Sequence, residues 1–475
     1  MIALTVAAVL IIVVTAGVLR RRLYRRSFSL PPRRHDTINC RNSKDAIAVR
    51  AEADGICVPD NLQPRGQTAL LQLTVNATLT GHWVDPFIEI QDEQHVYRQY
   101  FERGAAGQRY LNLSPVFQRS DRNSLSKILL RGRSIRWEPA AVLLLFESPS
   151  LENAAVLVLA PHPDDAEIAA FGMYAAHRSW VVTITAGERA TGNLAAIVPD
   201  NRRAHWAAVT RVWDSLSIPH FGEVPPGRRV NLVCPDGLLE SMYKEPTRPF
   251  RLACEETLPR RRLRSANHLP EFQQGGPGYT WSDLKAELRL LVEIIQPDIV
   301  VCPHPLVDIH SDHLFTTIAL EQAMRDLPRK PALFLYAVHT ARAPLHPFGS
   351  AQAVVSLPPW QDDAWIADSI YSHPLDALLQ RSKYFAVEAM HATRQYTEDE
   401  PDSMLQTVKS IGRKLLAFIA GTAVLPHSLL RRTARPNEIY YLASSDTLPE
   451  LTQRALAARY PGDKDTIDET TSASS

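Results

Sequence analysis

The sequence has few cysteines, no internal repeats and no excess of either charge. Its five cysteines, in a chain of 475 residues, include no pair with CxxC spacing. Their odd number argues against a full disulfide framework and is typical of a reducing compartment. The 52 Lys and Arg residues nearly balance the 51 Asp and Glu residues, which gives a formal net charge of +1. No chain-wide field therefore attracts nucleic acid, and partners have to be inferred from local sites.

One apolar run stands out from this balanced composition. Residues 2–19 carry no charged side chain and would span roughly 27 Å as a helix, close to the thickness of a hydrocarbon core. The basic sequence RRRLYRR follows, whereas a cleaved signal peptide carries its basic residues before the apolar run. We therefore predict an uncleaved single-pass anchor over residues 1–20 in the inner (plasma) membrane. The positive-inside rule predicts that the basic flank and all that follows it lie in the cytoplasm; a periplasmic location and a buried core helix are the alternatives.

The next segments differ in composition. Residues 21–45 are basic and polar, and we predict a linker able to touch anionic lipid headgroups. Residues 46–150 alternate short apolar stretches with Gly, Pro, Asn and Asp, which predicts a small β-sandwich. Its aromatic residues, such as Trp83, Phe87 and Tyr110, either line a carbohydrate-binding surface or belong to the core.

From residue 151 the pattern becomes that of an α/β domain. Continuous apolar runs such as AAVLVLA and PDIVVCP predict strands buried on both faces. Segments such as WSDLKAELRLLVEIIQ, with a capping-type Ser282, have the spacing of amphipathic helices. This alternation predicts a Rossmann-like, mostly parallel sheet over residues 151–425. We expect an inserted loop at 222–280 and a C-terminal extension, with a disordered tail, at 426–475.

Two basic segments of this region allow more than one interpretation. The sequence LPRRRLRS contains a cluster of arginines at 260–264, which either grips a phosphate or belongs to a solvated loop. The sequence SIGRKLLAFIAGTAVLPHSLLRR, residues 410–432, is too short and too interrupted to span a bilayer. It either lies on a membrane surface or packs as an ordinary helix.

Polar side chains follow two of the predicted strands, at the points where these strands end. HPDD, residues 162–165, comes after AAVLVLA, and HSDH, residues 310–313, comes after PDIVVCP. Because the carboxyl ends of parallel strands meet at one edge of a sheet, the two motifs can face each other across a crevice. Their nitrogen and oxygen donors suit zinc, whose catalytic sites keep three protein ligands and a water. For HPDD alone, a helix N-cap is the ordinary alternative.

Both motifs resemble those of the PIG-L/LmbE-like zinc-dependent N-deacetylases, which remove acetyl from N-acetylglucosamine-type groups on lipids, thiols or glycans. That family carries HPDD, usually followed by Glu, and a second motif H-x-D-H. The resemblance covers residues 153–340 and extends to YFAVEAMHATRQY at 384–396. Two departures, Ala166 in place of the usual Glu and His205 where the family often has Glu, concern substrate contacts more than chemistry.

The resemblance implies a role for each matching residue. The ligands of Zn²⁺, with Fe²⁺ as the alternative metal, would be His162, Asp165 and His313. The general base would be Asp164. The group that stabilises the oxyanion or protonates the departing amine would be His310, oriented by Asp312. The substrate contacts would come from Arg202 or Arg203 and from Asp236.

The sequence therefore predicts a membrane-anchored, zinc-dependent deacetylase. Its substrate would be an N-acetylglucosamine-type sugar in a glycolipid or cell-envelope polysaccharide, because an anchor raises the local concentration of a membrane-bound substrate. Two alternatives stay open: a glycan-binding scaffold with an inert metal site, and a zinc hydrolase of another amide or ester.

Overall fold

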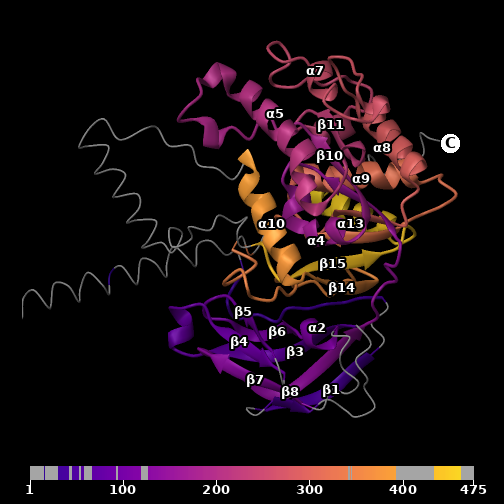
Figure 1. Cartoon of the computed structure of the whole chain (residues 1–475). Helices are drawn as coiled ribbons and strands as arrows, with labels where there is room; N and C mark the ends of the chain where they lie inside the picture. The colour runs from indigo at the N-terminus through magenta and orange to yellow at the C-terminus, as the bar shows by residue number, and fades with distance from the viewer. Residues whose placement is uncertain are drawn as a thin grey trace, which may run out of the picture.

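The computed structural model describes residues 30–41, 45–52, 55–57, 67–92, 95–118, 127–340, 343, 345–391 and 433–461, together with Thr15. Two domains lie one above the other in Figure 1, a β-sheet domain below and a larger α/β domain above. The α/β class that the sequence predicts is confirmed. The predicted anchor over 1–20 lies outside the described residues except for Thr15, and so do residues 410–432 and the tail after 461.

The lower domain is one antiparallel sheet that closes around its own core. Within the described residues its strand order is β5-β4-β7-β2-β1-β8-β3-β6. Apolar residues of β3 and β6 share one core cluster with Ile88 and Ile90 of β4, which lies near the other edge of the sheet. The sheet must therefore fold over itself. Its elements are β1 (Asp45–Glu52), β2 (Gly55–Cys57), β3 (Thr68–Ala77), η1 (Thr80–His82), β4 (Phe87–Gln91), β5 (Val96–Tyr100), β6 (Ala106–Asn112), α2 (Ser114–Phe117), β7 (Lys127–Arg133) and β8 (Ile135–Phe146).

One expectation for this part of the chain is wrong, and one open alternative is decided. Residues 30–41, predicted as part of a basic linker at 21–45, pack against the β-sheet domain. Arg34 is buried there and donates to Asp36 at 2.7 Å and to Glu102 at 2.8 Å. Tyr110 is not available to a carbohydrate surface, because its ring is buried and its hydroxyl accepts a hydrogen bond from the backbone of Ile38.

The upper domain is built on a seven-stranded sheet of order β11-β10-β9-β12-β13-β15-β14 within the described residues. The first five strands are parallel, and β15 is antiparallel to both of its neighbours. The strands are β9 (Ala155–Ala160), β10 (Arg178–Thr185), β11 (Arg229–Cys234), β12 (Ile299–Pro303), β13 (Ala332–Tyr336), β14 (Ser369–Pro374) and β15 (Asn437–Ala443).

Helices cover both faces of this sheet, because successive side chains of each strand point to opposite faces. Leu157 and Leu159 of β9 pack into the cluster that contains α8, α9 and α13, whereas Val156 and Val158 pack with α4 and α10. The helices are α3 (Asp165–Ala169), α4 (Phe171–Ala176), η2 (Gly192–Leu194), α5 (Asp200–Ser217), η3 (Ile218–Gly222), η4 (Pro226–Arg228), α6 (Leu239–Lys244), α7 (Arg260–Arg264), η5 (Pro270–Phe272), α8 (Trp281–Ile295), α9 (Ser311–Met324), α10 (Ala377–Ala389) and α13 (Leu448–Arg459).

Helix α8 begins one residue after a capping box. Thr280 accepts a hydrogen bond from the backbone of Asp283, whose carboxylate accepts one from the backbone of Thr280. The N-cap is therefore Thr280 and not Ser282, which already lies inside the helix. The helix is therefore capped two positions earlier than predicted. The Thr280–Asp283 pairing satisfies two backbone N–H groups that the helix itself leaves without a partner.

The predicted domain boundaries need two corrections. Residues 229–234, expected inside an insertion, form β11 at the edge of the main sheet. Residues 437–459, expected in an extension, supply β15 and α13 of the same domain. Two arginines of the 260–264 cluster fit neither predicted setting, because Arg260 and Arg264 are buried and donate to the backbone carbonyl of Leu232 in β11.

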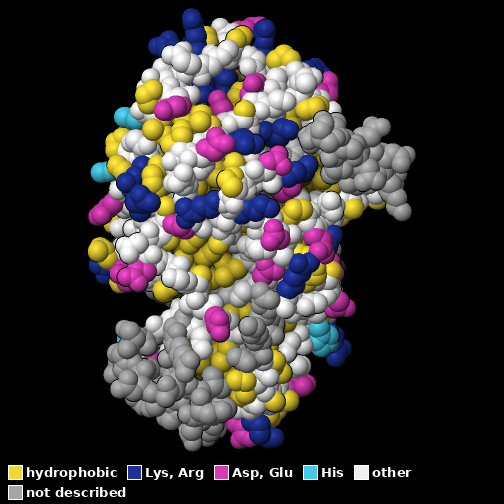
Figure 2. Space-filling model, turned by 90° about the vertical axis from the view of Figure 1, so that its right-hand side faces the viewer, with side chains coloured by type: hydrophobic (Ala, Val, Ile, Leu, Met, Phe, Trp, Pro, Cys, Tyr) yellow, Lys and Arg dark blue, Asp and Glu magenta, His cyan; other side chains and the backbone are white. Residues whose placement is uncertain are grey.

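The surface bears out the balanced composition. On the side of the molecule that Figure 2 shows, Lys and Arg side chains alternate with Asp and Glu side chains over the upper domain. In the part of the chain that the structure describes, no helix is both long and apolar enough to cross a membrane.

Candidate metal centre and active site

All of the polar motifs converge on one edge of the sheet. HPDD follows β9, Asp236 follows β11, and HSDH follows β12 after the turn that carries Asp308. These positions are the carboxyl ends of parallel strands, where ligand sites of open α/β sheets form.

Three side-chain atoms from the two motifs lie close enough to share one ion. Asp165 Oδ2 is 3.1 Å from His162 Nδ1 and 3.0 Å from His313 Nε2, and the two imidazole nitrogens are 3.3 Å apart. Ligands at zinc distances of about 2.0–2.2 Å in a tetrahedron lie about 3.3–3.6 Å from each other. The three atoms are therefore nearly at the separation that a bound zinc requires. The structure brings together the three residues that the resemblance implied as ligands.

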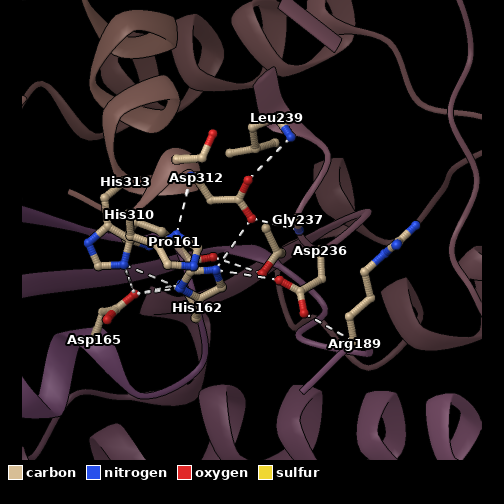
Figure 3. A network of polar contacts seen from close by, with 12 residues as sticks. Pro161, His162, Asp165, Arg189, Asp236, Gly237, Leu239, His310, Asp312 and His313 are labelled. Carbon is tan, nitrogen blue, oxygen red and sulfur yellow. Dashed lines mark hydrogen bonds and ion pairs between the residues drawn. The ribbon is translucent and has the colours of Figure 1, made fainter. Parts of the chain in front are cut away.

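A second layer of carboxylates holds the two imidazoles, as Figure 3 shows for His162. His162 Nε2 is 3.3 Å from Asp312 Oδ2 and 3.4 Å from Asp236 Oδ1. His313 Nδ1 is 2.9 Å from Asp308 Oδ2. Such carboxylates fix the ring orientation and tautomer of a metal-binding histidine and increase its basicity.

The charges of this cluster favour a cation. Burial alone would lower the pKa of His313, but Asp165 and Asp308 raise it to about 9. Burial would likewise lower the pKa of His162, but hydrogen bonds to three carboxylates raise it well above its usual value. The buried carboxylates therefore require positive charge between them. Histidine nitrogens and carboxylate oxygens are also a donor set that zinc and ferrous ions accept.

Three further groupings share these residues. His310 joins His162 and His313, His339 joins Asp165 and His313, and Asp236 and Asp312 join His162. In each grouping, one potential ligand atom from every residue lies within 4.8 Å of the others. His310 Nδ1 accepts a hydrogen bond from the backbone N–H of Asp312 at 3.2 Å. The proton of a neutral His310 ring is therefore on Nε2, where it can be donated to a substrate.

Asp164 differs from the other carboxylates because it remains in part accessible. Its side chain is 20% exposed, compared with 2% for Asp165 and 0% for Asp312. Arg211 Nη2 donates to Asp164 Oδ1 at 3.2 Å from the buried face of α5. A carboxylate held at one oxygen and open to solvent is suited to accept a proton from water.

The structure gives Asp312 a different contact from the one implied. Its carboxylate accepts from the backbone N–H groups of Gly237, at 2.7 Å, and Leu239, at 3.3 Å, and contacts His162. Only its backbone N–H reaches His310. The carboxylate of Asp312 therefore orients His162 and not the His310 ring.

Asp236 belongs to the cluster, whereas the two candidate arginines do not join it. Asp236 Oδ2 accepts from the backbone of Arg189 at 3.1 Å, and its own N–H is bound by the buried Glu188. Arg203 instead pairs with Asp200 at 2.6 Å and donates to the carbonyl of Val198 at 2.9 Å, and Arg202 points to solvent in the first turn of α5.

Sequence reasoning missed several residues of this site, among them His339, Arg211 and Gly187. Arg211 lies eight positions after Arg203 and belongs to no motif. It meets Asp164 because it lies on the buried side of α5. Gly187 makes room for it, because a Cβ at this position would lie 2.3 Å from Arg211 Nε, and its φ of +66° also favours glycine. A glycine in a loop does not indicate, in the sequence, which distant side chain will pack against it.

Residues 157–324 match the family described as PIG-L: GlcNAc-PI de-N-acetylase. The resemblance drawn from the two motifs is thereby confirmed over these residues.

Solved structures of similar proteins include an N,N'-diacetylchitobiose deacetylase from Pyrococcus horikoshii, 16% identical over 63% of this chain and 88% of its own, with a TM-score of 0.33. The zinc-inhibited form of the teicoplanin deacetylase Orf2 is 17% identical over 62% and 99% of the two chains, with a TM-score of 0.31. GalB from Pseudomonas putida, a 4-carboxy-2-hydroxymuconate hydratase, is 11% identical over 61% and 95%, with a TM-score of 0.32. No curated protein matches the chain.

Proposed function

We propose that this chain is a metal-dependent deacetylase that hydrolyses the N-acetyl group of an N-acetylglucosamine-type sugar. The observation that carries the proposal is the meeting of His162, Asp165 and His313 within 3.3 Å of one another, next to the partly exposed Asp164. The PIG-L match over residues 157–324 supports the same reaction.

The metal would be held by His162, Asp165 and His313. A zinc ion, or a ferrous ion in its place, would supply Lewis acidity and lower the pKa of a bound water. Asp308 and Asp312 would keep the two imidazoles in the orientation that binding requires, since each contacts the ring nitrogen turned away from the three-ligand centre.

The chain's own groups then account for the proton movements. Asp164 accepts a proton from the attacking water, while Arg211 keeps the carboxylate from rotating. His310 Nε2 donates a hydrogen bond to the carbonyl oxygen as negative charge develops on it. When the C–N bond breaks, the proton held by Asp164 moves to the departing amine nitrogen, so that acetate and a free amine leave.

The proposal extends to where the enzyme works. The apolar run at residues 2–19, followed by RRRLYRR, supports an inner-membrane anchor with the catalytic domain on the cytoplasmic side. The substrate would then be a glycolipid or an envelope polysaccharide, held on the same surface as the enzyme.

Acetate release from N-acetylglucosamine conjugates tests this function. The purified full chain is stripped with a chelator, reloaded with Zn²⁺ or Fe²⁺, and compared with its Asp164→Ala variant. We expect release that requires metal and that the variant loses. Release of a different acid would favour another amide or ester substrate. Stoichiometric metal without any release would favour a glycan-binding scaffold.

A further inference from the structure

The outer sides of α5 and α10 expose large apolar side chains. Trp206 and Trp213 on α5 are 46% and 56% exposed, and Phe385 on α10 is 59% exposed. Trp206 and Trp213 are seven residues apart, so they lie on the same side of the helix, roughly 10 Å from each other along its axis. We call the surface formed by Trp206, Trp213, Phe221, Leu378 and Phe385, which are all exposed, the aromatic face.

Contacts hold α5, α10 and η3, the elements that carry this face, next to one another. The ring of Trp213 lies 6.0 Å from that of His391, which follows the last residues of α10. The next residue of α5, Asp214, is 2.7 Å from His391 Nδ1. Helix α10 also packs on η3, which carries Phe221. Both helices lie on the left of the upper domain in Figure 1, whereas Figure 2 presents the right-hand side.

The described residues stop at one end of α10 and begin again near its other end. Residue 391 lies at its C-terminal end, and the chain resumes near its N-terminal end, where Gln380 donates to the carbonyl of Ala434 at 2.9 Å. The sequence between them includes residues 410–432, which combine an apolar run with Lys and Arg and contain no Asp or Glu. Such a composition favours a surface of anionic lipid.

The side chains of the aromatic face also suit a bilayer better than a glycan. Tryptophan favours the level of lipid headgroups, and phenylalanine and leucine favour the acyl chains below them. Leu378 offers a sugar no polar group and no ring for stacking. Arg202 and Arg381 are exposed on the same two helices, where their guanidinium groups can reach phosphates.

We infer that the aromatic face rests on a bilayer that contains anionic lipid. This contact is separate from any anchor at residues 1–20, and it fixes how the catalytic domain is turned toward the membrane. The inference goes beyond the proposed function, because it concerns a surface and not the reaction.

The tryptophan distribution allows a direct test. All eight tryptophans lie in the described part of the chain, and Trp83, 40% exposed in the lower domain, is a control matched in exposure. The full chain is reconstituted in vesicles of phosphatidylcholine and phosphatidylglycerol whose phosphatidylcholine carries bromine atoms on its acyl chains. Bromine quenches only the tryptophans that enter the bilayer.

We expect quenching of the unaltered chain, loss of most of it in the double variant Trp206→Phe/Trp213→Phe, and no loss in Trp83→Phe. Phenylalanine keeps the surface apolar, so loss of the signal reports contact and not loss of docking. Unquenched vesicle-bound protein, or equal quenching in the double variant, would overturn the inference. A doubled mass without quenching would assign the face to a second copy, and blue-shifted but unquenched emission would assign it to residues 392–432.

A second measurement separates this inference from the deacetylase proposal. The double variant Trp206→Glu/Trp213→Glu should keep its acetate release from a soluble conjugate and lose at least tenfold on a lipid-linked conjugate in vesicles. Equal activity of the variant and the unaltered chain on both substrates would count against docking. The quenching result holds even if no substrate releases acetate.

Discussion

Arg211 and Asp164 form a contact of 3.2 Å between the buried face of α5 and the first helical turn after β9. Arg211 is itself buried, and its Nε atom has no hydrogen-bond partner within the described residues. The guanidinium thus gives up part of its own hydrogen bonding to hold one oxygen of a carboxylate that solvent reaches. This arrangement is expected where the orientation of the carboxylate matters to the reaction.

The Asp164→Asn substitution should reduce turnover by roughly 10²- to 10⁴-fold, the usual contribution of a general base. Asparagine fills the same space but cannot accept a proton. Because His162, Asp165 and His313 are untouched, metal content should stay at the level of the unaltered chain. Measurement of kcat together with metal analysis checks this, and unchanged turnover would remove Asp164 from the role of base.

Replacement of Arg211 by Met should lower kcat by roughly 10- to 100-fold with little change in KM, because the base remains but is misplaced. Arg211→Lys should restore part of the lost rate, since a cation is again present. Arg202→Met on the same helix is the control, and on a soluble substrate it should change neither constant. A larger loss at Arg202 would instead support the substrate contact that the family resemblance implied.

Asp308→Asn should weaken metal binding by about 10- to 100-fold, as loss of an outer-layer carboxylate typically does. Asp308 Oδ2 holds His313 Nδ1 at 2.9 Å and also accepts from the backbone of Val338 at 2.7 Å. Competition with a chelator measures the affinity without any need for activity. The exposed His268 offers a control, and His268→Ala should bind metal like the unaltered chain.

Stability should depend on the buried pair of Lys383 and Glu438, whose charged atoms lie 2.7 Å apart. Lys383→Met leaves the carboxylate buried without its cation, and such a loss costs about 3–5 kcal/mol. The double variant Lys383→Met/Glu438→Gln should regain part of it.

The exposed pair of Arg289 and Glu293 on α8 is the control for this measurement. Arg289→Met should cost less than about 1 kcal/mol, because solvent already screens the pair. Chemical unfolding of the full chain compares the variants. Equal losses for Lys383→Met and Arg289→Met would show that burial adds nothing to the first pair.

The strands that carry the site could be predicted because each is a continuous apolar run that ends in a polar motif. AAVLVLA and PDIVVCP contain β9 and β12. HPDD begins just after β9, and HSDH follows β12 after the turn that carries Asp308. In such segments the local pattern and the position in the fold agree, since a strand buried on both faces has to be apolar throughout.

The elements that could not be predicted depend on contacts between residues far apart in the sequence. RVNLVC, which forms β11, holds an Arg and an Asn. Asn231 Nδ2 donates to Ser215 Oγ at 2.8 Å, and Arg229 donates to the carbonyls of Val224 at 2.6 Å and Leu216 at 3.1 Å. Arg260 and Arg264 look like a solvated cluster in the sequence but donate to buried carbonyls of β11. Polar residues that are paired only in the folded chain hide a buried element from a sequence-based prediction.

The position of β15 has a consequence for how the chain folds during synthesis. Residues 437–443 lie between β13 and β14 and pair with both. Strand β14 therefore has no place in the sheet until residues made more than sixty positions later have left the ribosome. β14 also faces the lower domain, where Ser372 donates its backbone N–H to Thr68 at 2.9 Å. The two domains can fold separately while translation continues, and the part of their junction that β14 contributes is completed only when β15 arrives.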